Sequence, residues 1–161
     1  MTPTPLTRRA ILGLLMASVA ACGPPSVENP DVPSDLYPGE TQRMRAMIED
    51  SAAFHEIPEA LLHKVIQRES GYNPAARNGP YYGLMQILPQ TARTMGYEGP
   101  DSGLLDAETS LRWAGAYLRG AWIVSDGSLD DAVGWYARGY YYEARDRGLL
   151  VETGLRDREL R

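Results

Sequence analysis

The sequence predicts a mainly α-helical domain, and three observations support this prediction. Apolar residues recur at three- and four-residue spacing in several stretches after residue 40. Residue types typical of helix caps stand at the starts of two of these stretches. Gly, Pro and Asn are concentrated between Asn73 and Gln86, so this part should form a loop or a short irregular hairpin. A chain of 161 residues has room for one domain with one core.

The first two helices are expected over Glu40–Phe54 and Ile57–Ser70. Pro58 suits the first turn of the second helix, where a missing N–H leaves no hydrogen bond unmade. His63 falls on the polar side of this helix and is expected at the surface. The apolar residues at helical spacing are Met44, Met47, Ile48 and Phe54 in the first helix, and Leu61, Leu62, Val65 and Ile66 in the second.

The remaining helices are expected later in the chain. Asp106 should cap the longest one, and Ser128 with Asp131 resembles a capping box. The core face of the longest helix should consist of Leu111, Ala114, Gly115, Leu118 and Trp122. The expected ranges are Pro89–Met95, Ala107–Val124, Ser128–Arg138, Tyr140–Gly148 and Thr153–Leu160.

Glu69 is the candidate catalytic residue. It continues the apolar face of the Ile57–Ser70 helix, three and four residues after Ile66 and Val65, and it lies in the last turn before Gly71. Partial burial and the negative end of the helix dipole both disfavour the charged carboxylate, so the pKa should rise. A carboxylic acid that stays protonated near neutral pH can act as a general acid. The alternative is a Glu at the edge of the stripe whose carboxylate reaches water.

The residues that follow Glu69 form an ordered signature. It resembles that of the soluble lytic transglycosylase domain, a family similar in fold to goose-type lysozyme that cleaves the glycan strands of bacterial peptidoglycan. The resemblance extends more weakly from about Glu40 to Arg147. The matching residues are Glu69-Ser70, Tyr72-Asn73-Pro74, Gly83-Leu84-Met85-Gln86-Ile87-Leu88-Pro89 and Thr91-Ala92.

The resemblance implies a lysozyme-like helical fold and a reaction that uses a single carboxylate. One Glu protonates the glycosidic oxygen between N-acetylmuramic acid and N-acetylglucosamine. It then takes the proton of the muramyl C6 hydroxyl, which attacks the anomeric carbon and leaves a 1,6-anhydromuramyl end. Glu69 is expected in both roles. No second carboxylate stands out in the sequence, because helix caps or solvent-facing positions account for the other candidates, namely Asp101, Asp106, Glu108, Asp126, Asp130 and Asp131.

The resemblance also implies a set of substrate-binding residues. Gln86 could bond an N-acetyl group or a sugar hydroxyl, and Gly83 would allow close approach of the glycan. In the family Tyr-Asn-x-Gly motif the tyrosine hydroxyl reaches the catalytic carboxyl, but here Ala137 replaces the asparagine. Tyr81, Tyr82, Tyr141 and Tyr142 could stack on sugars or serve in packing. The complete expected set is Ser70, Asn78, Tyr82, Gly83, Met85, Gln86 and Tyr136.

Residues 1–21 have the features of an export signal. Arg8 and Arg9 precede a short apolar run, which is too short for an ordinary membrane-spanning helix. Val-Ala-Ala followed by Cys22, the only cysteine, resembles a lipoprotein cleavage box, and the alternative is a plain secretory signal. The paired arginines also resemble a twin-arginine export signal. Gly23 replaces the aspartate that retains such lipoproteins in the inner membrane, which favours an outer-membrane anchor facing the periplasm.

The expected domain organisation is therefore a signal over residues 1–21, a proline-rich tether over 22–39 and a catalytic domain over 40–161. Removal of the signal takes away two arginines and no acidic residue, so the formal net charge moves from −5 to −7. This acidity argues against a nucleic-acid partner. His55 and His63 lack partners at ligand spacing, so neither a metal site nor a cofactor is expected.

Three functions remain open at this stage. The first is a membrane-anchored lytic transglycosylase acting on peptidoglycan glycan strands, with cell-wall or secretion machinery as further partners. The second is a lysozyme-like muramidase, which hydrolyses the same bond with water and needs a base to position that water. The third is a catalytically weak lipoprotein that binds peptidoglycan, which the change at Ala137 makes conceivable.

Overall fold

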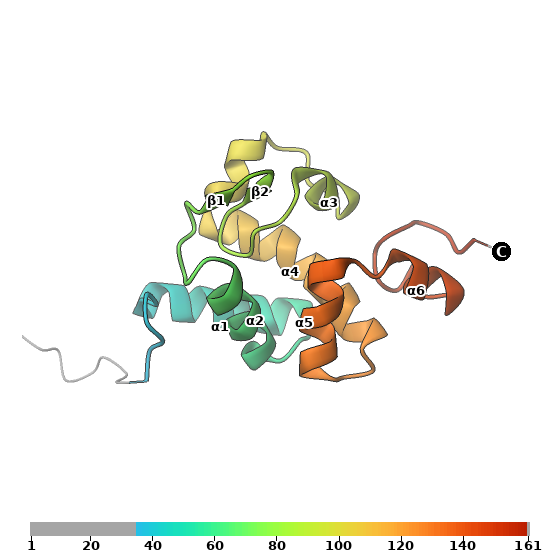
Figure 1. The fold of residues 1–161 in the computed structure, drawn as a ribbon, viewed down its shortest axis with the longest axis horizontal. Coiled ribbons are helices and arrows are strands. Elements are labelled where there is room, and N and C mark those ends of the chain that lie inside the picture. Colours follow the sequence, from blue (N-terminus) through green and yellow to red (C-terminus); the bar gives the residue numbers. More distant parts are fainter. Residues whose placement is uncertain (1–34, 161) are drawn as a thin grey trace, which may run out of the picture. The chain divides into compact units, whose positions relative to one another are not determined.

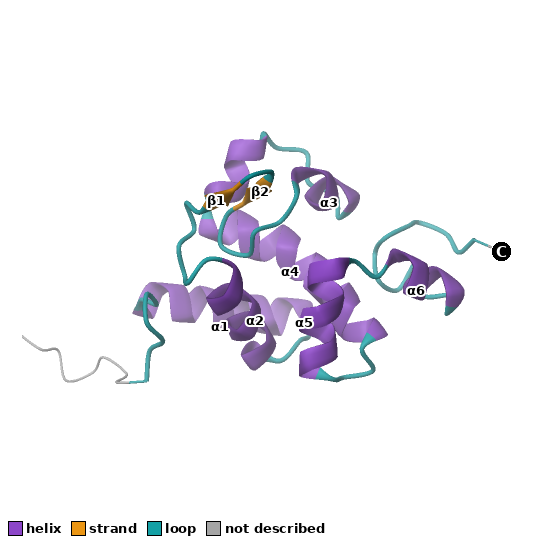
Figure 2. Cartoon of the chain, in the orientation of Figure 1, coloured by secondary structure: helices purple, strands orange, loops and turns teal. Residues whose placement is uncertain are grey.

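A computed structural model of the protein describes residues 35–160, which belong to one compact unit. The described part is mainly helical, with one small hairpin, as the sequence predicts (Figure 1). Figure 2 shows how little of it is strand. The helices are α1 Gln42–His55, α2 Glu59–Glu69, α3 Pro89–Thr94, α4 Ala107–Val124, α5 Leu129–Arg138 and α6 Tyr141–Asp146, with a 3-10 helix η1 Asp101–Leu105 and strands β1 Arg77–Asn78 and β2 Tyr81–Tyr82.

Helix α4 is the central packing element, because α1, α3, α5 and η1 all contact it. Its predicted N-cap is confirmed: the Asp106 side chain accepts a hydrogen bond from the Thr109 backbone N–H at 2.8 Å. Gly115 lets α1 approach closely, since an added Cβ would lie 2.5 Å from the His55 ring. The predicted core residues Leu111, Ala114, Gly115 and Leu118 are buried, while Trp122 is only partly buried.

Helix α1 packs through a different stripe from the one predicted. Met44 and Ile48 are buried, but Phe54 is 58% exposed. The buried stripe continues from Ile48 through Ala52 to His55, at four- and three-residue steps, and Phe54 lies outside this phase. The ring of Phe54 lies 4.2 Å from the Arg112 guanidinium on the surface.

His63 is buried, which corrects the expectation that it lies at the surface. Its Nδ1 lies 2.7 Å from the Tyr72 hydroxyl, and its Nε2 lies 3.0 Å from the Glu59 carboxylate. The Tyr37 ring covers the same side, with its centre 4.9 Å from that of His63. The periodicity of α2 misses this contact, because the covering residues come from two other segments, around Tyr37 and Tyr72.

The predicted irregular hairpin is formed by β1 and β2, which pair antiparallel with Asn78 opposite Tyr81. The chain then enters the interior as a non-regular segment, residues 83–87, in which every residue is buried. Gly83 begins this segment with φ +79°, and a Cβ there would lie 1.9 Å from the Leu104 carbonyl oxygen. The close approach that requires this glycine is therefore made by η1, which the sequence analysis did not predict.

The predicted helix over Thr153–Leu160 is wrong, because these residues form turns and loop. Gly154 has φ +73°, a left-handed conformation that interrupts a helix. Glu159 turns back along the chain, and its carboxylate accepts hydrogen bonds from the N–H groups of Leu150 and Val151 at 3.1 and 2.7 Å. The C-terminal segment is therefore fixed by side-chain contacts instead of helical ones.

The Gly83→Ala substitution should destabilise the domain strongly. The added Cβ clashes with the Leu104 backbone, and the left-handed φ disfavours alanine, so we expect a loss of about 3 kcal/mol in the free energy of unfolding. Gly79→Ala is a matched control, because φ is +58° there but no atom lies near the added Cβ. It should lose only about 1 kcal/mol. Urea denaturation followed by circular dichroism measures both values, and equal losses would contradict the role of the Leu104 contact.

Candidate active site

Glu69 is the last residue of α2, which buries Leu62, Val65 and Ile66 in the core. The helix ends here because Ser70 leaves the helical conformation, and the Ser70 backbone N–H still donates to the Ile66 carbonyl oxygen. The Glu69 side chain retains 24% of its exposure. The apolar stripe of α2 therefore carries this carboxylate to the border between core and solvent.

Burial raises the pKa of Glu69 above its usual value, and the nearby Arg68 guanidinium opposes this rise. The Arg68 Nε atom lies 3.5 Å from Glu69 Oε1, and the Arg68 side chain is 54% exposed. Because water screens such an exposed cation, burial decides the direction. The direction agrees with the expectation from the sequence.

The Glu69 side chain lines a cavity of about 300 Å³. A second cavity of about 260 Å³ adjoins it, and the two share Tyr81, Gln86, Tyr136 and Ala137. They therefore form sections of one groove. The first cavity brings together four of the predicted site residues with three others: Glu69, Asn78, Gln86 and Tyr136, with Arg68, Tyr81 and Ala137.

Ser70 and Met85 lie outside the lining of this cavity. The Ser70 hydroxyl donates to the Leu84 carbonyl oxygen at 2.6 Å, and Met85 is fully buried in the core. Both residues therefore stabilise the backbone and core next to the cavity, and neither lines it.

Tyr82 and Gly83 are also absent from the lining of this cavity. The Tyr82 hydroxyl accepts a hydrogen bond from Arg77 at 2.7 Å, and the Arg77 guanidinium lies 4.4 Å from the Tyr82 ring centre. The space that a side chain at Gly83 would need is occupied by Leu104 and not left open for a glycan. Both residues shape the loop that carries Asn78 and Tyr81.

Gln86 is buried with φ +49°, an uncommon conformation for a residue other than glycine. Its side-chain amide donates to the carbonyl oxygens of Ala76 and Gly83 at 3.1 and 2.9 Å. Its Oε1 has no hydrogen-bond partner within the described residues. The amide thus holds the hairpin loop in place and leaves an acceptor unused.

Tyr136 comes from α5 and is buried against the same segment. Its hydroxyl donates to the Met85 carbonyl oxygen at 2.9 Å. Burial raises the pKa of this phenol well above its usual value, and the negative charge of Glu69 adds to the rise. Tyr136 therefore stays protonated close to the carboxyl group of Glu69.

Within the described residues, Glu69 is the only carboxylate that lines either cavity. Two of the other acidic candidates form ion pairs at the surface instead. Asp101 pairs with Arg93, and Asp130 pairs with Lys64 at 2.8 Å. The described part of the chain also holds no cluster of three or more His, Cys, Asp or Glu side chains that could bind a metal ion.

A family model for the transglycosylase SLT domain matches residues 46–147, which is more than half of the chain. The chain belongs to this family. Members of the SLT family are generally lytic transglycosylases of peptidoglycan, and this activity class places the protein in the cell envelope. No solved structure matches the chain. In the part of the chain that the structure covers, no helix is both long and apolar enough to cross a membrane.

The SLT match includes every residue that lines the cavity around Glu69. Arg68 is the one lining residue that the sequence analysis did not consider. The sequence could have indicated it, because Arg68 directly precedes the candidate acid and its positive charge lowers the pKa of Glu69. The match ends at Arg147, so the C-terminal loop after α6 lies beyond it.

The Arg68→Gln substitution should shift the pH dependence of glycan cleavage. The general acid must be protonated, so activity falls as the pH rises through the pKa of Glu69. Removal of the cation raises this pKa further, so the falling limb should move to higher pH. A pH–rate profile of kcat/KM measures the shift. Arg112→Gln is the control, because Arg112 lines neither cavity, and a shift equal in both variants would contradict a local effect.

Proposed function

We propose that the protein is a lytic transglycosylase that cleaves the β-1,4 bond between N-acetylmuramic acid and N-acetylglucosamine and leaves 1,6-anhydromuramyl ends. The observation that carries this proposal is a single carboxyl group, that of Glu69, with a raised pKa in the wall of a groove. Among the described residues no second carboxylate lines that groove. A pair of carboxylates is what most hydrolytic glycosidases require.

The reaction proceeds in two proton transfers through the same group. Protonated Glu69 donates its proton to the glycosidic oxygen, and the bond between that oxygen and the muramyl anomeric carbon breaks. The muramyl C6 hydroxyl then attacks the anomeric carbon, and its proton passes to the Glu69 carboxylate. Glu69 is protonated again at the end, so no water enters the reaction.

The residues around Glu69 would bind and orient the sugar. The Tyr136 proton is engaged by the Met85 carbonyl oxygen, so the phenol oxygen is available as an acceptor for Glu69 or for a sugar hydroxyl. The N–H groups of Gln86 are engaged as well, and its unpartnered Oε1 is buried, so this side chain would have to turn toward the cavity to accept from an N-acetyl N–H or a hydroxyl. Asn78 and Tyr81 face the same cavity from the hairpin.

A Glu69→Gln substitution should abolish turnover of purified peptidoglycan. Glutamine has nearly the same shape but no proton to donate, and loss of a general acid reduces rates by about 10²–10⁴-fold. Mass spectrometry of the released muropeptides should show anhydromuramyl ends with the wild-type protein and none with the variant. Glu98→Gln, at an exposed position outside the groove, is the matched control and should remain active.

The other outcomes identify the two alternative functions. Reducing ends in place of anhydro ends would show a muramidase that uses water. Binding of peptidoglycan by the wild-type protein without any released product would show a catalytically weak binding lipoprotein.

We further propose that the protein is exported and anchored by a lipid on Cys22, at the outer membrane facing the periplasm. The signal over residues 1–21, Cys22 and most of the tether lie outside the described residues, so this proposal rests on the sequence. The domain's residues 35–39 already contact the catalytic unit, since Tyr37 stacks near Tyr72 at 6.1 Å between ring centres. Such an anchor would place the groove near the cell wall and near any secretion machinery that crosses it.

The Cys22→Ser substitution should release the protein from the membrane fraction. Lipid modification requires the cysteine thiol, so the variant loses the anchor that the sequence predicts. Cell fractionation with immunoblotting measures the distribution. Ser26→Ala, at a position in the tether, is the control and should leave the protein in the membrane fraction. Retention of the Cys22 variant in the membrane would contradict the lipid anchor.

A further inference from the structure

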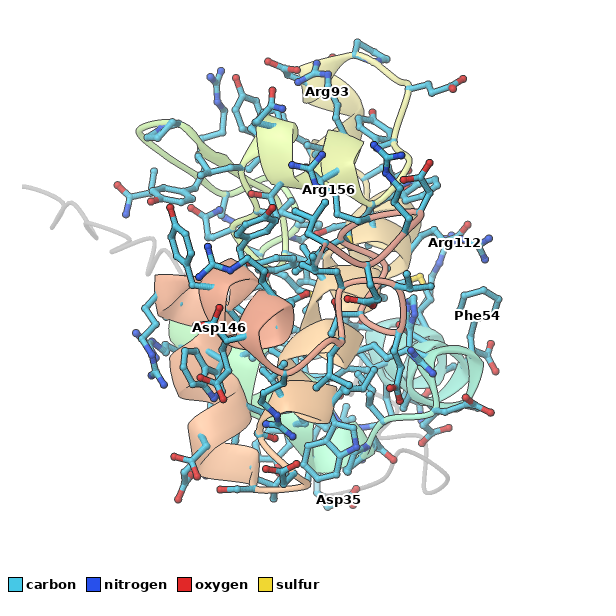
Figure 3. All side chains as sticks on the ribbon, turned by 90° about the vertical axis from the view of Figure 1, so that its right-hand side faces the viewer. Asp35, Phe54, Arg93, Arg112, Asp146 and Arg156 are labelled. Carbon is cyan, nitrogen blue, oxygen red and sulfur yellow. The ribbon has the colours of Figure 1, made fainter. Side chains whose placement is uncertain are left out.

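A third cavity, of about 720 Å³, lies between α3, Tyr141 of α6 and the loop around Leu155 and Arg156. Figure 3 shows Arg156 beside the ribbon of α3. None of the residues assigned to the reaction lines this cavity. It is therefore a separate section of the surface whose role the proposed reaction leaves open.

The third cavity lies beside the second along α3 and the start of α6, although the two cavities share no lining residue. Thr91 and Gly139 line the second cavity, while Gln90 and Tyr141 line the third. Gln90 directly precedes Thr91, and Tyr141 stands two residues after Gly139. Thr94, which also lines the third cavity, stands one helical turn after Thr91, so the two cavities lie along the same face of α3.

The wall formed by the C-terminal loop is built from specific contacts. Leu155 is buried, and the Thr153 hydroxyl donates to the Leu149 carbonyl oxygen at 2.7 Å. The Arg156 backbone N–H donates to the Leu150 carbonyl oxygen at 3.1 Å, and Glu159 binds the N–H of Leu150 at the same distance. This loop lies beyond the SLT match, so it adds a wall that the family domain alone does not supply.

The lining of the third cavity suits an uncharged, polar ligand. Gln90 contributes an amide and Thr94 a hydroxyl, while Arg156 and Asp157 contribute one charge of each sign. The Arg156 guanidinium lies 5.7 Å from the centre of the Tyr141 ring. Arg156 has no ion pair within the described residues, so its N–H groups are available for a ligand. An amide, a guanidinium and an aromatic ring together match the hydroxyls, acetamido groups and ring faces of sugars.

We propose that the C-terminal loop extends the groove with a third section, which binds sugar units of the same glycan strand at a distance from the bond that is cleaved. This proposal rests on the proposed function, because the ligand is the continuation of the substrate. The section makes the enzyme sensitive to strand length. Long strands fill all three cavities, whereas a short oligosaccharide held at Glu69 does not reach Arg156.

The test compares kcat/KM on a tetrasaccharide and on much longer strands, both freed of their peptides. The wild-type protein should favour the longer strands. Arg156→Gln should lower kcat/KM on them by about tenfold, as expected for one hydrogen-bonding cation, and leave the tetrasaccharide unchanged. Tyr141→Leu should act in the same way. Arg158→Gln, two residues further on and outside the cavity lining, is the matched control and should match the wild-type protein on both substrates.

Each outcome has a distinct meaning. Equal losses on both substrates, or a wild-type protein without length preference, would overturn the third section. A length preference that appears only on strands that keep their peptides would assign the cavity to the peptide and also overturn the proposal. Thermal melting of each variant identifies a loss caused by misfolding. If the wild-type protein cleaves neither substrate, it is the proposed function that fails.

Discussion

The groove depends on the burial of an irregular backbone segment, residues 83–87, in the middle of a helical domain. Leu84 and Met85 are fully buried, yet their carbonyl oxygens have no helix or sheet to bond them. Ser70 donates to the first and Tyr136 to the second, and the Met85 N–H donates to Ser110 at 3.4 Å. Each of these groups left unpaired would cost about 1–3 kcal/mol. The hydroxyls that satisfy them come from the residue directly after α2 and from α4 and α5, so one segment connects the elements that surround the site.

This tie explains why Glu69 is held where it is. Ser70 follows Glu69 directly, so the bond from Ser70 to the Leu84 carbonyl fixes the end of α2 against the segment that carries Gln86. Tyr136 is held against the same segment from α5, and its ring faces the groove. The pairing of these buried backbone groups therefore fixes the site. The same packing partly buries Glu69, and this burial raises its pKa.

Sequence reasoning predicted the long helices and their caps, because periodicity and capping are local signals. Asp106 and Ser128 cap α4 and α5 as predicted. Two of its wrong predictions, the exposed His63 and the C-terminal helix, concern positions where contacts between separate segments determine the structure. Tyr37 and Tyr72 bury His63, and the Glu159 carboxylate binds the Leu150 N–H and folds the C-terminal loop back. The signature also pointed to Glu69 and Gln86, which line the same cavity. It could not distinguish residues that face a substrate from residues that bond or pack against buried backbone. Ser70, Gly83 and Met85 are of the second kind, and their neighbours in space are far away in sequence.

Among the described residues, Glu69 is the only carboxylate in the first two cavities, and this is consistent with the proton balance of the proposed reaction. A hydrolase must activate water while it protonates the leaving oxygen, so two groups change their protonation state in opposite directions. In the intramolecular reaction the proton lost to the glycosidic oxygen is replaced by the proton of the C6 hydroxyl. One group can then serve in both steps, provided that its acid form is populated before the bond breaks and its base form is not strongly solvated afterwards. Partial burial of Glu69 acts in favour of both conditions because it raises the pKa and limits contact with water, while the exposed Arg68 opposes the rise. A second carboxylate close by would repel the charge of the first, so the two would titrate as a coupled pair that shares a proton. The proposed reaction needs only one group that changes its protonation state.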